Sequence, residues 1–293
     1  MVISKIIGGL GNQMFQYAAG YSLAKKINEE FKIDLRFFKN YNLHNGSELG
    51  SVFSISANNA STEDIKKVLG WRKSPIILNI LEKKKCPLLN GSKCIMEYGF
   101  EYWPFIQRIK TDCYLTGYWQ SDKYFNDYSS EIRKQFVFKK PIDAINSEIA
   151  SAISSCNSVS LHVRRGDYAN NQKTLEIHGL CSVDFYKEAI AYIDKTVSNP
   201  IYYIFSDDIE WAKNNIKISS LCHYINHNNG KESYNDMRLI SLCKSHIISN
   251  STFSWWGAWL SVSNNKIVIM PKQWFADKSI ITRDIVPHSW ITI

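Results

Sequence analysis

Three residues at the end of an apolar run near the middle of the chain could bind an anion, His162, Arg164 and Arg165, and the carboxylate of Asp167 follows them. If the run is a strand, its side chains alternate between two faces, so His162 and Arg164 share one side and Arg165 lies on the other. Guanidinium groups form bidentate hydrogen bonds with phosphate oxygens, and a carboxylate can orient such a group. The segment therefore predicts a phosphate-binding turn; a salt bridge between Arg165 and Asp167 is the alternative.

Ser251, Thr252 and Ser254 bring small hydroxyl side chains to the start of a second apolar segment, which is typical of a helix. The order there is Asn250, Ser251, Thr252, Phe253 and Ser254. Backbone N–H groups at a helix N-terminus lack intrahelical partners, and the helix dipole favours negative charge there. A phosphate can be held at such a position without a metal ion. An ordinary N-cap formed by Ser251 or Thr252 is the alternative, and the two interpretations are compatible.

Two carboxylates, Asp207 and Asp208, follow another apolar run. A carboxylate beside a nucleotide pocket can accept hydrogen bonds from the N1–H and amino groups of guanine. The alternative is an N-cap followed by an acidic residue in the first turn of a helix.

A glycine-rich segment near the N-terminus, residues 8–11, is followed by Asn12 and Gln13. It lacks the spacing of the dinucleotide fingerprint and the Gly-Lys-Ser/Thr of a phosphate-binding loop. We therefore expect its glycines to let the backbone approach a bulky substrate, while the two amides offer hydrogen bonds to hydroxyl groups. A tight turn with a capping asparagine is the alternative.

The elements that must position these residues alternate regularly in the second half of the chain. Apolar runs predict strands at residues 159–163, 201–205, 246–249 and 267–270, and helical spacing predicts helices at 182–194, 209–215, 232–244 and 253–261. Such alternation is typical of a parallel sheet covered by helices, in which ligands bind at the carboxyl ends of the strands. We expect neighbouring strands to bring the arginine, aspartate and serine segments to one edge.

The first half shows a weaker version of this pattern. It predicts strands at 2–7, 33–37 and 113–116 and helices at 12–26 and 121–136, with irregular structure or a variable insertion between 39 and 110. A break at Lys139-Lys140-Pro141 places the domain boundary there, giving domains 1–140 and 141–293.

Composition sets the limits of these interpretations. The chain has 293 residues, of which 45% are hydrophobic and 21% charged, so it should fold into about two domains rather than stay disordered. The net charge of +8 favours anionic partners, and nine tryptophans with sixteen tyrosines indicate a thick core or stacking surfaces.

The seven scattered cysteines lack the close spacing of zinc or redox motifs. We expect a reducing compartment and a cytoplasmic location, because no apolar run has the length of a signal peptide or a membrane span. Peripheral membrane contact through Lys83-Lys84-Lys85 or Lys139-Lys140 is a further expectation, and ordinary solvated lysines are its alternative.

Five segments together resemble the bacterial alpha-1,2-fucosyltransferases of glycosyltransferase family eleven. They are Gly-Gly-Leu-Gly-Asn-Gln-Met-Phe-Gln-Tyr-Ala at 8–18, Gly-Tyr-Trp-Gln-Ser at 117–121, His-Val-Arg-Arg-Gly-Asp-Tyr at 162–168, Phe-Ser-Asp-Asp at 205–208 and Asn-Ser-Thr-Phe-Ser-Trp-Trp at 250–256. They run in this order and span the chain nearly end to end.

The resemblance implies an α/β protein of GT-B-like fold, with an acceptor-side N-terminal domain and a Rossmann-like C-terminal domain that binds the donor. It implies transfer of L-fucose from GDP-fucose to the 2-hydroxyl of a terminal beta-galactoside, with inversion and with no metal or other cofactor. The acceptor would be an oligosaccharide or a lipid-linked glycan in O-antigen-type synthesis.

The resemblance also implies roles for single residues. Arg164 would hold the beta-phosphate and Arg165 would support its loop, His162 with Asp207 and Asp208 would contact guanosine, and Ser251 to Ser254 would contact the pyrophosphate. On the acceptor side, Asn12 matches an asparagine near the transferred sugar in related enzymes, and Gln13, Trp119 and Trp255 are the candidate substrate contacts. Core packing is the alternative for Trp255.

A general base is expected to take the proton of the acceptor hydroxyl, and Asp167 is the first candidate, with Glu176 the second. The departing phosphate or the amide of Asn12 could replace a base. Other functions are a fucosyltransferase of another linkage, a transferase of another GDP-sugar, and a non-catalytic carbohydrate-binding protein. No nucleic-acid-binding module is recognised, so nucleic acid is not an expected partner.

Overall fold

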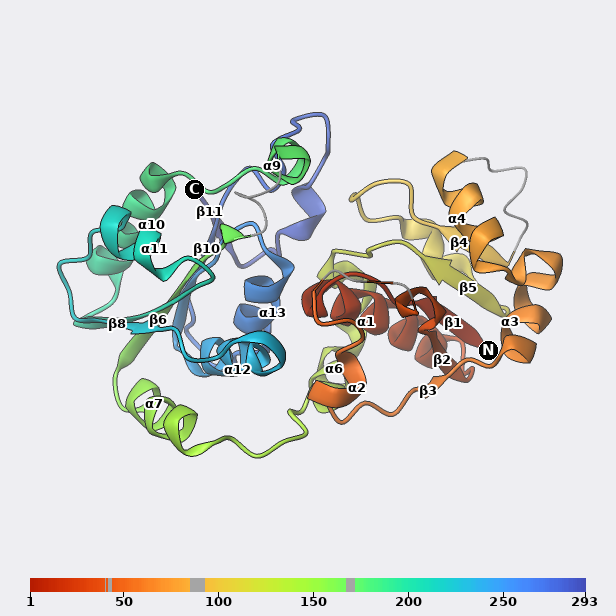
Figure 1. The fold of residues 1–293 in the computed structure, drawn as a ribbon, viewed down its shortest axis with the longest axis horizontal. Coiled ribbons are helices and arrows are strands. Elements are labelled where there is room, and N and C mark those ends of the chain that lie inside the picture. The colour runs from red at the N-terminus through yellow and green to blue at the C-terminus, as the bar shows by residue number, and fades with distance from the viewer. Residues whose placement is uncertain (40, 42–43, 85–92, 167–171) are drawn as a thin grey trace. The chain divides into compact units, whose positions relative to one another are not determined.

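The computed structural model describes residues 1–39, 41, 44–84, 93–166 and 172–293, and these form two compact units. The N-terminal unit comprises Met1–Lys139 together with Arg283–Ile285, and the C-terminal unit comprises Lys140–Thr282 and Val286–Ile293. Each unit contains one parallel sheet with helices on its faces (Figure 1).

The N-terminal sheet has the strand order β3-β2-β1-β5-β4 in the described part of the chain, and every pairing is parallel. The order reverses between β1 and β5, which makes that point a topological switch point. The strands are β1 (Val2–Lys5), β2 (Phe31–Asp34), β3 (Asn58–Asn59), β4 (Cys94–Met96) and β5 (Cys113–Thr116). The helices are α1 (Leu10–Lys26), α2 (Leu49–Val52), α3 (Thr62–Leu69), α4 (Pro75–Lys84) and α6 (Ser129–Gln135).

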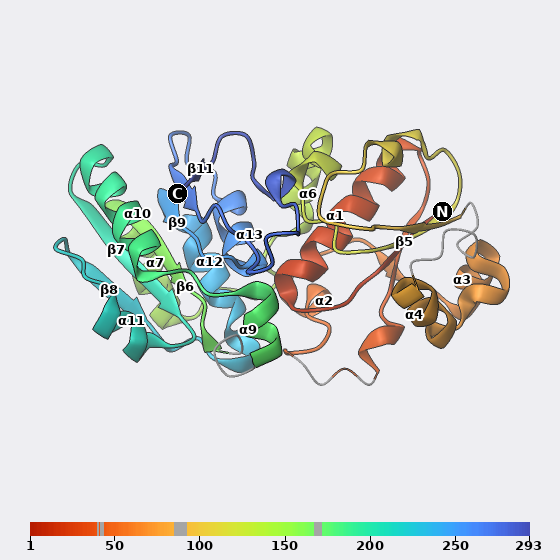
Figure 2. The same cartoon turned by 90° about the horizontal axis from the view of Figure 1, so that it is seen from above.

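Helices cover both faces of this sheet. Successive residues of a strand point to opposite faces, so neighbouring residues of β1 contact different helices. On one face, Gly20 of α1 lies so close to β1 and β2 that a Cβ there would stand 2.1 Å from Ser4 Oγ and 2.5 Å from the Phe31 ring. On the other, Ile3 packs in a cluster with residues of α3 and α4. Figure 2 shows the course of α1, α3 and α4 in this unit. Helices packed on both faces therefore hold β1, and with it the carboxyl end of the strand, in place.

The C-terminal sheet has the order β11-β10-β9-β6-β7-β8, again with parallel pairings throughout the described residues. This is the 3-2-1-4-5-6 arrangement of Rossmann folds, with its switch point between β6 and β9. The strands are β6 (Asn157–Val163), β7 (Pro200–Ser206), β8 (Cys222–Ile225), β9 (Ser245–Ile247), β10 (Val268–Met270) and β11 (Ile291–Thr292).

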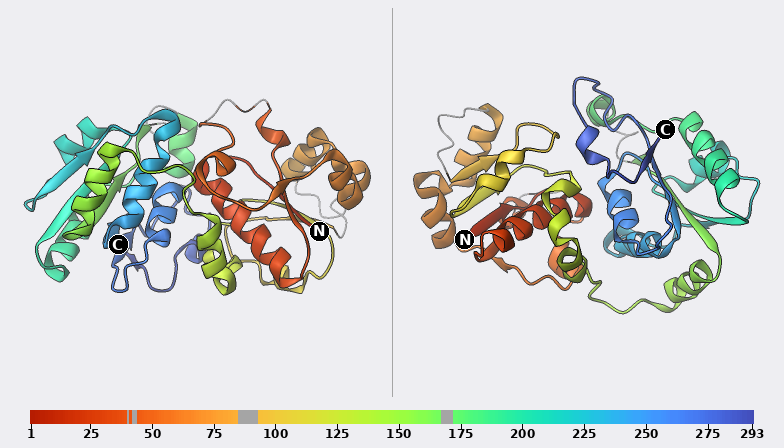
Figure 3. Two further views of the ribbon diagram at one scale, coloured as in Figure 1. Left: turned by 90° about the horizontal axis from the view of Figure 1, so that it is seen from below. Right: turned by 180° about the vertical axis from the view of Figure 1, so that it is seen from behind.

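Six helices accompany this sheet in the described ranges: α7 (Ala144–Ser154), α9 (Gln172–His178), α10 (Val183–Thr196), α11 (Ile209–Asn215), α12 (Tyr234–Leu242) and α13 (Thr252–Leu260). Residues of α10 and α11 pack in one apolar cluster, and residues of α7 and α12 pack in another. Figure 3 shows the helices of this unit around its sheet from two further sides. Because α7 and α12 bury one face of β7 and α10 buries the other face of the sheet, the strand ends at the switch point are held on both sides.

The alternation predicted for the second half is confirmed, and β5 and α11 have the predicted bounds. Three predictions in the first half are wrong. The strand predicted at 33–37 ends at Asp34, whose carboxylate accepts the backbone N–H of Arg36 at 3.0 Å and starts a 3₁₀ turn, Arg36–Phe38. The helix predicted at 121–136 is two 3₁₀ turns, Asp122–Tyr124 and Asn126–Tyr128, followed by α6.

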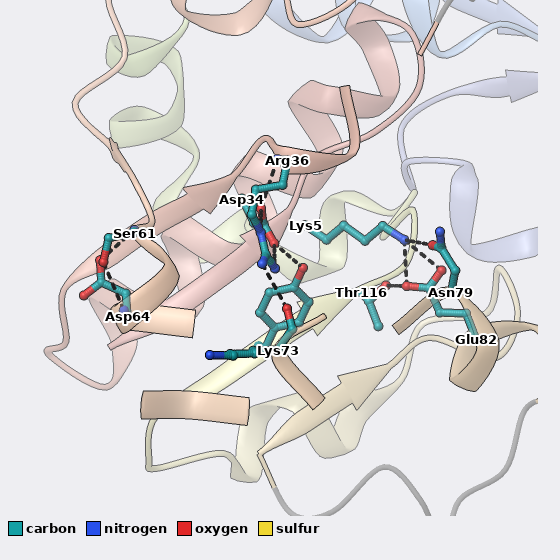
Figure 4. Close-up of polar contacts among 10 residues, drawn as sticks. Lys5, Asp34, Arg36, Ser61, Asp64, Lys73, Asn79, Glu82 and Thr116 are labelled. Atoms are coloured by element: carbon teal, nitrogen blue, oxygen red, sulfur yellow. Dashed lines mark hydrogen bonds and ion pairs between the residues drawn. The ribbon is translucent and has the colours of Figure 1, made fainter. Parts of the chain in front are cut away.

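The third error concerns residues 39–110, which contain regular helices rather than irregular structure alone. Helix α3 begins with a capping box, in which Ser61 Oγ accepts the Asp64 N–H at 3.0 Å and Asp64 accepts the Ser61 N–H at 2.8 Å (Figure 4). The apolar residues Ile65, Val68 and Leu69 then follow at helical spacing and are buried. This signal was present in the sequence, among lysines that obscured it.

The segment Arg283–Ile285 packs with residues far from it in the chain. Asp284 is 7% exposed, accepts the Tyr102 N–H at 2.8 Å and pairs with Lys123, all within the N-terminal unit. In the described ranges, no helix has the length and apolar character needed to cross a membrane.

Candidate active site

The carboxyl ends of three neighbouring strands carry the polar residues that the sequence singled out. Strand β6 pairs with β7 on one side and with β9 on the other. The segments that follow these strands begin at Arg164, Asp207 and Ile248, so they meet at the switch point of the C-terminal sheet. The prediction of one shared edge is confirmed, and such an edge is where open α/β sheets bind ligands.

Asp207 fixes the arginine turn in place. Its Oδ2 accepts from Arg164 Nη1 at 3.0 Å, and its Oδ1 accepts the backbone N–H of Arg165 at 2.8 Å. Gly166 is required beside it, because a Cβ there would stand 2.8 Å from Asp207 Oδ2. Both charged side chains remain about a quarter exposed, at 28% for Arg164 and 25% for Asp207. The pair therefore holds a cationic group at the edge of the sheet.

Strand β6 ends at Val163, before both arginines, and Arg165 packs against different residues from Arg164. The Arg165 guanidinium lies 4.0 Å above the Trp211 ring, and its Nε is 3.6 Å from Asp208 Oδ2. Asp208 also caps α11 by accepting the Trp211 N–H at 3.1 Å. The predicted support of the loop by Arg165 thus has a structural basis in α11. Its alternative partner, Asp167, lies outside the described residues.

His162 is a buried neutral group at the end of β6. It is 6% exposed, its Nδ1 lies 2.9 Å from Ser249 Oγ, and its ring is 5.9 Å from that of Phe253. Desolvation lowers the pKa of its imidazole to about 4, with Arg164 also lowering it and Asp207 opposing the shift. At neutral pH it offers hydrogen bonds without charge. Its contact with guanosine, like those of Asp207 and Asp208, stays a prediction.

The N-terminus of α13 lies at the same edge. Ser251 occupies the N-cap position with extended backbone angles, yet its side chain makes no capping hydrogen bond, so this cap is not formed by Ser251. Ser254 is fully buried and donates to the Ser251 carbonyl at 3.2 Å, while Thr252 and Phe253 are half-buried. A helix N-terminus attracts anions through its N–H groups and dipole.

Asn250 is a site-supporting residue whose role the sequence did not reveal. Its buried Nδ2 donates to the carbonyls of His178 at 2.8 Å and Trp274 at 3.2 Å, and its Oδ1 accepts from Cys181 Sγ at 3.4 Å. One amide therefore ties two loops to the end of β9. Only its position directly before Ser251 could have suggested this.

Three predicted substrate contacts are corrected by the structure. Trp255 and Gln13 have no exposed surface, and Trp119 is 1% exposed. The Trp255 ring packs against three other tryptophans, and Trp119 packs edge-on against Tyr124. The Gln13 amide donates to two backbone carbonyls and accepts the Glu48 N–H at 2.9 Å. These residues pack in the core, where they have almost no surface to offer a ligand.

In the N-terminal unit, Asn12 lies at the switch point between β1 and β5. Its Oδ1 accepts from Gln120 Nε2 at 2.9 Å, which joins the glycine-rich segment to the loop after β5. Gln16 makes a second connection, accepting the Ile7 N–H at 2.8 Å and donating to the Gly117 carbonyl at 3.1 Å. These hydrogen bonds place Asn12 at the switch point of this sheet, and its proximity to substrate stays a prediction.

Buried charged side chains that no sequence motif marks lie at the carboxyl edge of this sheet. Lys5 Nζ contacts both carboxylate oxygens of Glu82, at 2.7 and 2.8 Å, and Thr116 also donates to Glu82 (Figure 4). Asp34 accepts from Arg36 Nη2 at 2.8 Å and from the Tyr114 hydroxyl at 2.7 Å. Lys5, Asp34 and Thr116 are the last residues of their strands, and a polar residue ending an apolar run was the available signal.

Glu97 follows β4 and binds the backbone of the loop after β5. Its Oε2 accepts the N–H groups of Tyr118 at 2.6 Å and Trp119 at 2.9 Å. Desolvation raises the pKa of this carboxyl to about 7, and the two backbone hydrogen bonds only partly oppose the shift. Glu176, the second candidate base, is exposed and accepts from Gln172 at 3.1 Å.

Two parallel sheets of Rossmann type, each with polar strand ends at a switch point, define an α/β protein of the GT-B-like class. The crystal structure of fucosyltransferase NodZ from Bradyrhizobium supports this class, with a TM-score of 0.55 at 14% identity over 87% of this chain and 91% of that one. A structure of NodZ alpha-1,6-fucosyltransferase soaked with GDP-fucose gives a TM-score of 0.52. At such identity the likeness shows the fold.

The sequence profile of Glycosyl transferase family 11 matches residues 1–293. An alpha-1,2-colitosyltransferase of Escherichia coli is 36% identical over 301 residues, covering 100% of this chain and 99% of the relative. The O-antigen biosynthesis glycosyltransferase WbnK of Escherichia coli is 30% identical over 311 residues, covering 99% of each. The chain belongs to glycosyl transferase family 11.

Proposed function

We propose that the protein transfers L-fucose from GDP-beta-L-fucose to the 2-hydroxyl of a terminal beta-galactoside, with inversion, in synthesis of a surface glycan of O-antigen type. The main support for this proposal is the position of Arg164. It is held by Asp207 at the switch point of a Rossmann-type sheet, in a member of glycosyl transferase family 11. The names of the relatives support the 2-linkage and the O-antigen context, and NodZ supports the donor.

In this proposal the C-terminal unit binds the donor and the N-terminal unit binds the acceptor. As the fucosyl–phosphate bond breaks, positive charge grows on the sugar ring and negative charge on GDP. Arg164 and the α13 N-terminus at Ser251 supply preorganised donors for the pyrophosphate, and one such donor contributes roughly 2.7–4 kcal/mol to the transition state. His162, neutral at pH 7, serves the nucleoside without adding charge.

Arg164 and the helix N-terminus take the role that a divalent cation has in other sugar-nucleotide enzymes. Metal independence follows as part of the proposal, and so does action on an oligosaccharide or lipid-linked acceptor at the cytoplasmic face of a membrane. Contact with that membrane would be peripheral and electrostatic.

A second donor is favoured by one observation, the 36% identity to an alpha-1,2-colitosyltransferase. Colitose is L-fucose without the 3-hydroxyl group, so the two donors differ by one hydrogen-bonding group. A site that hydrogen-bonds a substrate hydroxyl rejects the analogue lacking it by about 10⁴–10⁵ in kcat/KM, whereas a site without such a bond discriminates weakly.

The deciding experiment offers the purified protein GDP-fucose or GDP-colitose with a panel of beta-galactosides, in excess EDTA. NMR of the product then gives the sugar, linkage and anomeric configuration. We expect an alpha-1,2-linked fucoside at undiminished rate in EDTA. Another linkage, preference for colitose, or loss of activity restored by Mg²⁺ would each overturn the corresponding part of the proposal.

A further inference from the structure

We propose that Glu97 is the general base that removes the proton from the acceptor hydroxyl. The inference rests on the proposed function, since it takes the N-terminal unit to bind the acceptor. It assigns the base to a residue outside every motif that the sequence analysis singled out. The geometry that carries it lies wholly within the N-terminal unit.

The Glu97 carboxylate is anchored through one of its oxygens. Oε2 accepts the two successive N–H groups of Tyr118 and Trp119, while no described residue donates to Oε1. The side chain is neither fully buried nor fully exposed. A carboxylate has lone pairs on both oxygens. Fixing one oxygen and leaving the other for a hydroxyl is the arrangement that a positioned base needs.

The loop after β5 is shaped around this carboxylate. Gly117 has φ 155, and a Cβ there would lie 2.4 Å from Glu97 Cβ, so only glycine fits. Trp119 adopts φ 56, a left-handed conformation that costs a bulky residue roughly 1–3 kcal/mol. Burial of its indole keeps it there. Strain of this kind clusters at functional sites, and here it turns two N–H groups toward one oxygen.

The same loop connects Glu97 to the rest of the ligand-binding edge. Its next residue, Gln120, donates to Asn12 at 2.9 Å. Tyr118 is 41% exposed and stacks on Phe100, with ring centroids 6.1 Å apart and planes at 16°. An exposed aromatic face next to a carboxylate suits a sugar ring, which stacks its apolar face while its hydroxyls reach polar groups.

Other carboxylates at this edge are engaged. Glu82 holds Lys5 and Thr116, and Asp34 holds Arg36. The titratable groups that face Glu97 are the phenols of Tyr118 and Tyr124, and burial raises the pKa of both, so they are neutral at pH 7.

Glu82 faces Tyr118 from α4 and further raises the pKa of that phenol. The carboxyl of Glu97 has a pKa raised to about 7 by desolvation, close to the value that makes a base effective at neutral pH.

Glu97 Oε1 takes the proton of the acceptor 2-hydroxyl as that oxygen forms its bond to the anomeric carbon. The electron pair of the anomeric C–O bond leaves with the GDP phosphate. The neutral carboxylic acid then returns its proton to water, which regenerates the base for the next cycle.

The test compares Glu97→Gln with wild type and with a matched control, Glu101→Gln. The glutamine carbonyl can still accept both backbone N–H groups, so the loop is kept. Glu101 follows β4 as Glu97 does, and its carboxylate pairs with exposed Arg283 at 2.7 Å. We expect Glu97→Gln to lower kcat about 10²–10⁴-fold with GDP affinity unchanged, and to remove the fall in kcat/KM below about pH 7. The control should match wild type.

Azide separates a base from a structural role, because this anionic acceptor has no proton to lose. Transfer to azide by Glu97→Gln should equal that by wild type, and Glu97→Asp should recover part of the normal activity. Equal losses with azide and galactoside, or an unchanged pH profile, would overturn the assignment of Glu97. If wild type itself transfers neither sugar, the proposed function fails first, and the inference falls with it.

Discussion

At the carboxyl edge of the C-terminal sheet, Arg164 pairs with Asp207 while about a quarter of each side chain stays exposed, at 28% and 25%. At the same edge of the N-terminal sheet, Lys5 and Asp34 are 4% and 0% exposed and sit inside ion pairs. The two sheets share parallel strands and a switch point, so topology does not account for this contrast. The residues that end the strands do.

The contrast separates two kinds of binding. A guanidinium that is oriented by an ion pair and still about a quarter exposed can exchange water for phosphate oxygens. Lys5, by contrast, is 4% exposed and is held by Glu82, so its ammonium has almost no surface left for a ligand and instead fixes the shape of the edge. The C-terminal edge is therefore suited to a charged ligand, and the N-terminal edge is suited to a neutral one with hydroxyl groups.

Removal of a buried charge should give the largest effect. Asp34→Ala leaves the Arg36 guanidinium and the Tyr114 hydroxyl without their shared acceptor, at a cost of about 3–5 kcal/mol in the free energy of unfolding. Hydrogen exchange of the N-terminal unit measures this loss. Glu210→Ala, which breaks the exposed pair with Lys213, is the control and should change little. A loss no larger than the control would remove the distinction between the edges.

Arg164→Ala comes next and should act on turnover rather than stability. It removes one donor to the developing charge on the leaving group, so kcat should fall by two or more orders of magnitude, about 2.7–4 kcal/mol. Arg165→Ala is the comparison, since Arg165 stacks on Trp211 and supports the turn. Steady-state kinetics with saturating acceptor gives both values. A tenfold or smaller effect at Arg164 contradicts its role.

Asp207→Asn tests whether the carboxylate positions the arginine. The asparagine oxygen can still accept the Arg165 N–H, but the ion pair with Arg164 at 3.0 Å is lost. We expect a fall of about tenfold in kcat/KM for the donor, equivalent to about 1.4 kcal/mol. Donor titrations at fixed acceptor measure it. Kinetics equal to wild type would show that the turn holds Arg164 without help.

The smallest effect concerns pH. Asp236 of the C-terminal unit accepts from Asn228 at 2.8 Å, and desolvation raises the pKa of its carboxyl from the ordinary 3.8 to about 7. The folded protein therefore binds more protons than the unfolded chain between these values, and stability falls as pH rises through that window. Asp236→Asn should flatten this slope in thermal unfolding, as Glu97→Gln should in the other unit. An unchanged slope would argue against burial as the cause.

The sequence predicted much of the C-terminal half because its central strands carry apolar residues, at every second position in β6 and nearly throughout β7, and end directly before polar ones, Arg164 and Asp207. It predicted the N-terminal half less well. Helix α3 was hidden because lysines surround its apolar stripe, and the strand β2 was misplaced because Asp34 turns the chain by accepting a backbone N–H. Such a turn depends on a local hydrogen bond that periodicity does not report.

The sequence likewise predicted the candidate site residues of the C-terminal unit better than those of the N-terminal unit. The arginine turn has a motif with a chemical meaning, and its partner Asp207 was already a candidate. Glu97 had no such signal, because its properties come from desolvation and from backbone groups of a loop that follows another strand. The burial of Trp119 and Trp255 also required the packing of distant rings, which a motif does not contain.

The inclusion of Arg283–Ile285 in the N-terminal unit has a consequence for how the chain is made. During synthesis, the ribosome releases Tyr102 and Lys123 long before Asp284, the residue that accepts the Tyr102 N–H and pairs with Lys123. The N-terminal unit is therefore translated first, but its fold is complete only after residues 283–285 have been made. A fragment that ends at Lys139 lacks this carboxylate, and an early stop codon near the C-terminus would damage the opposite end of the sequence.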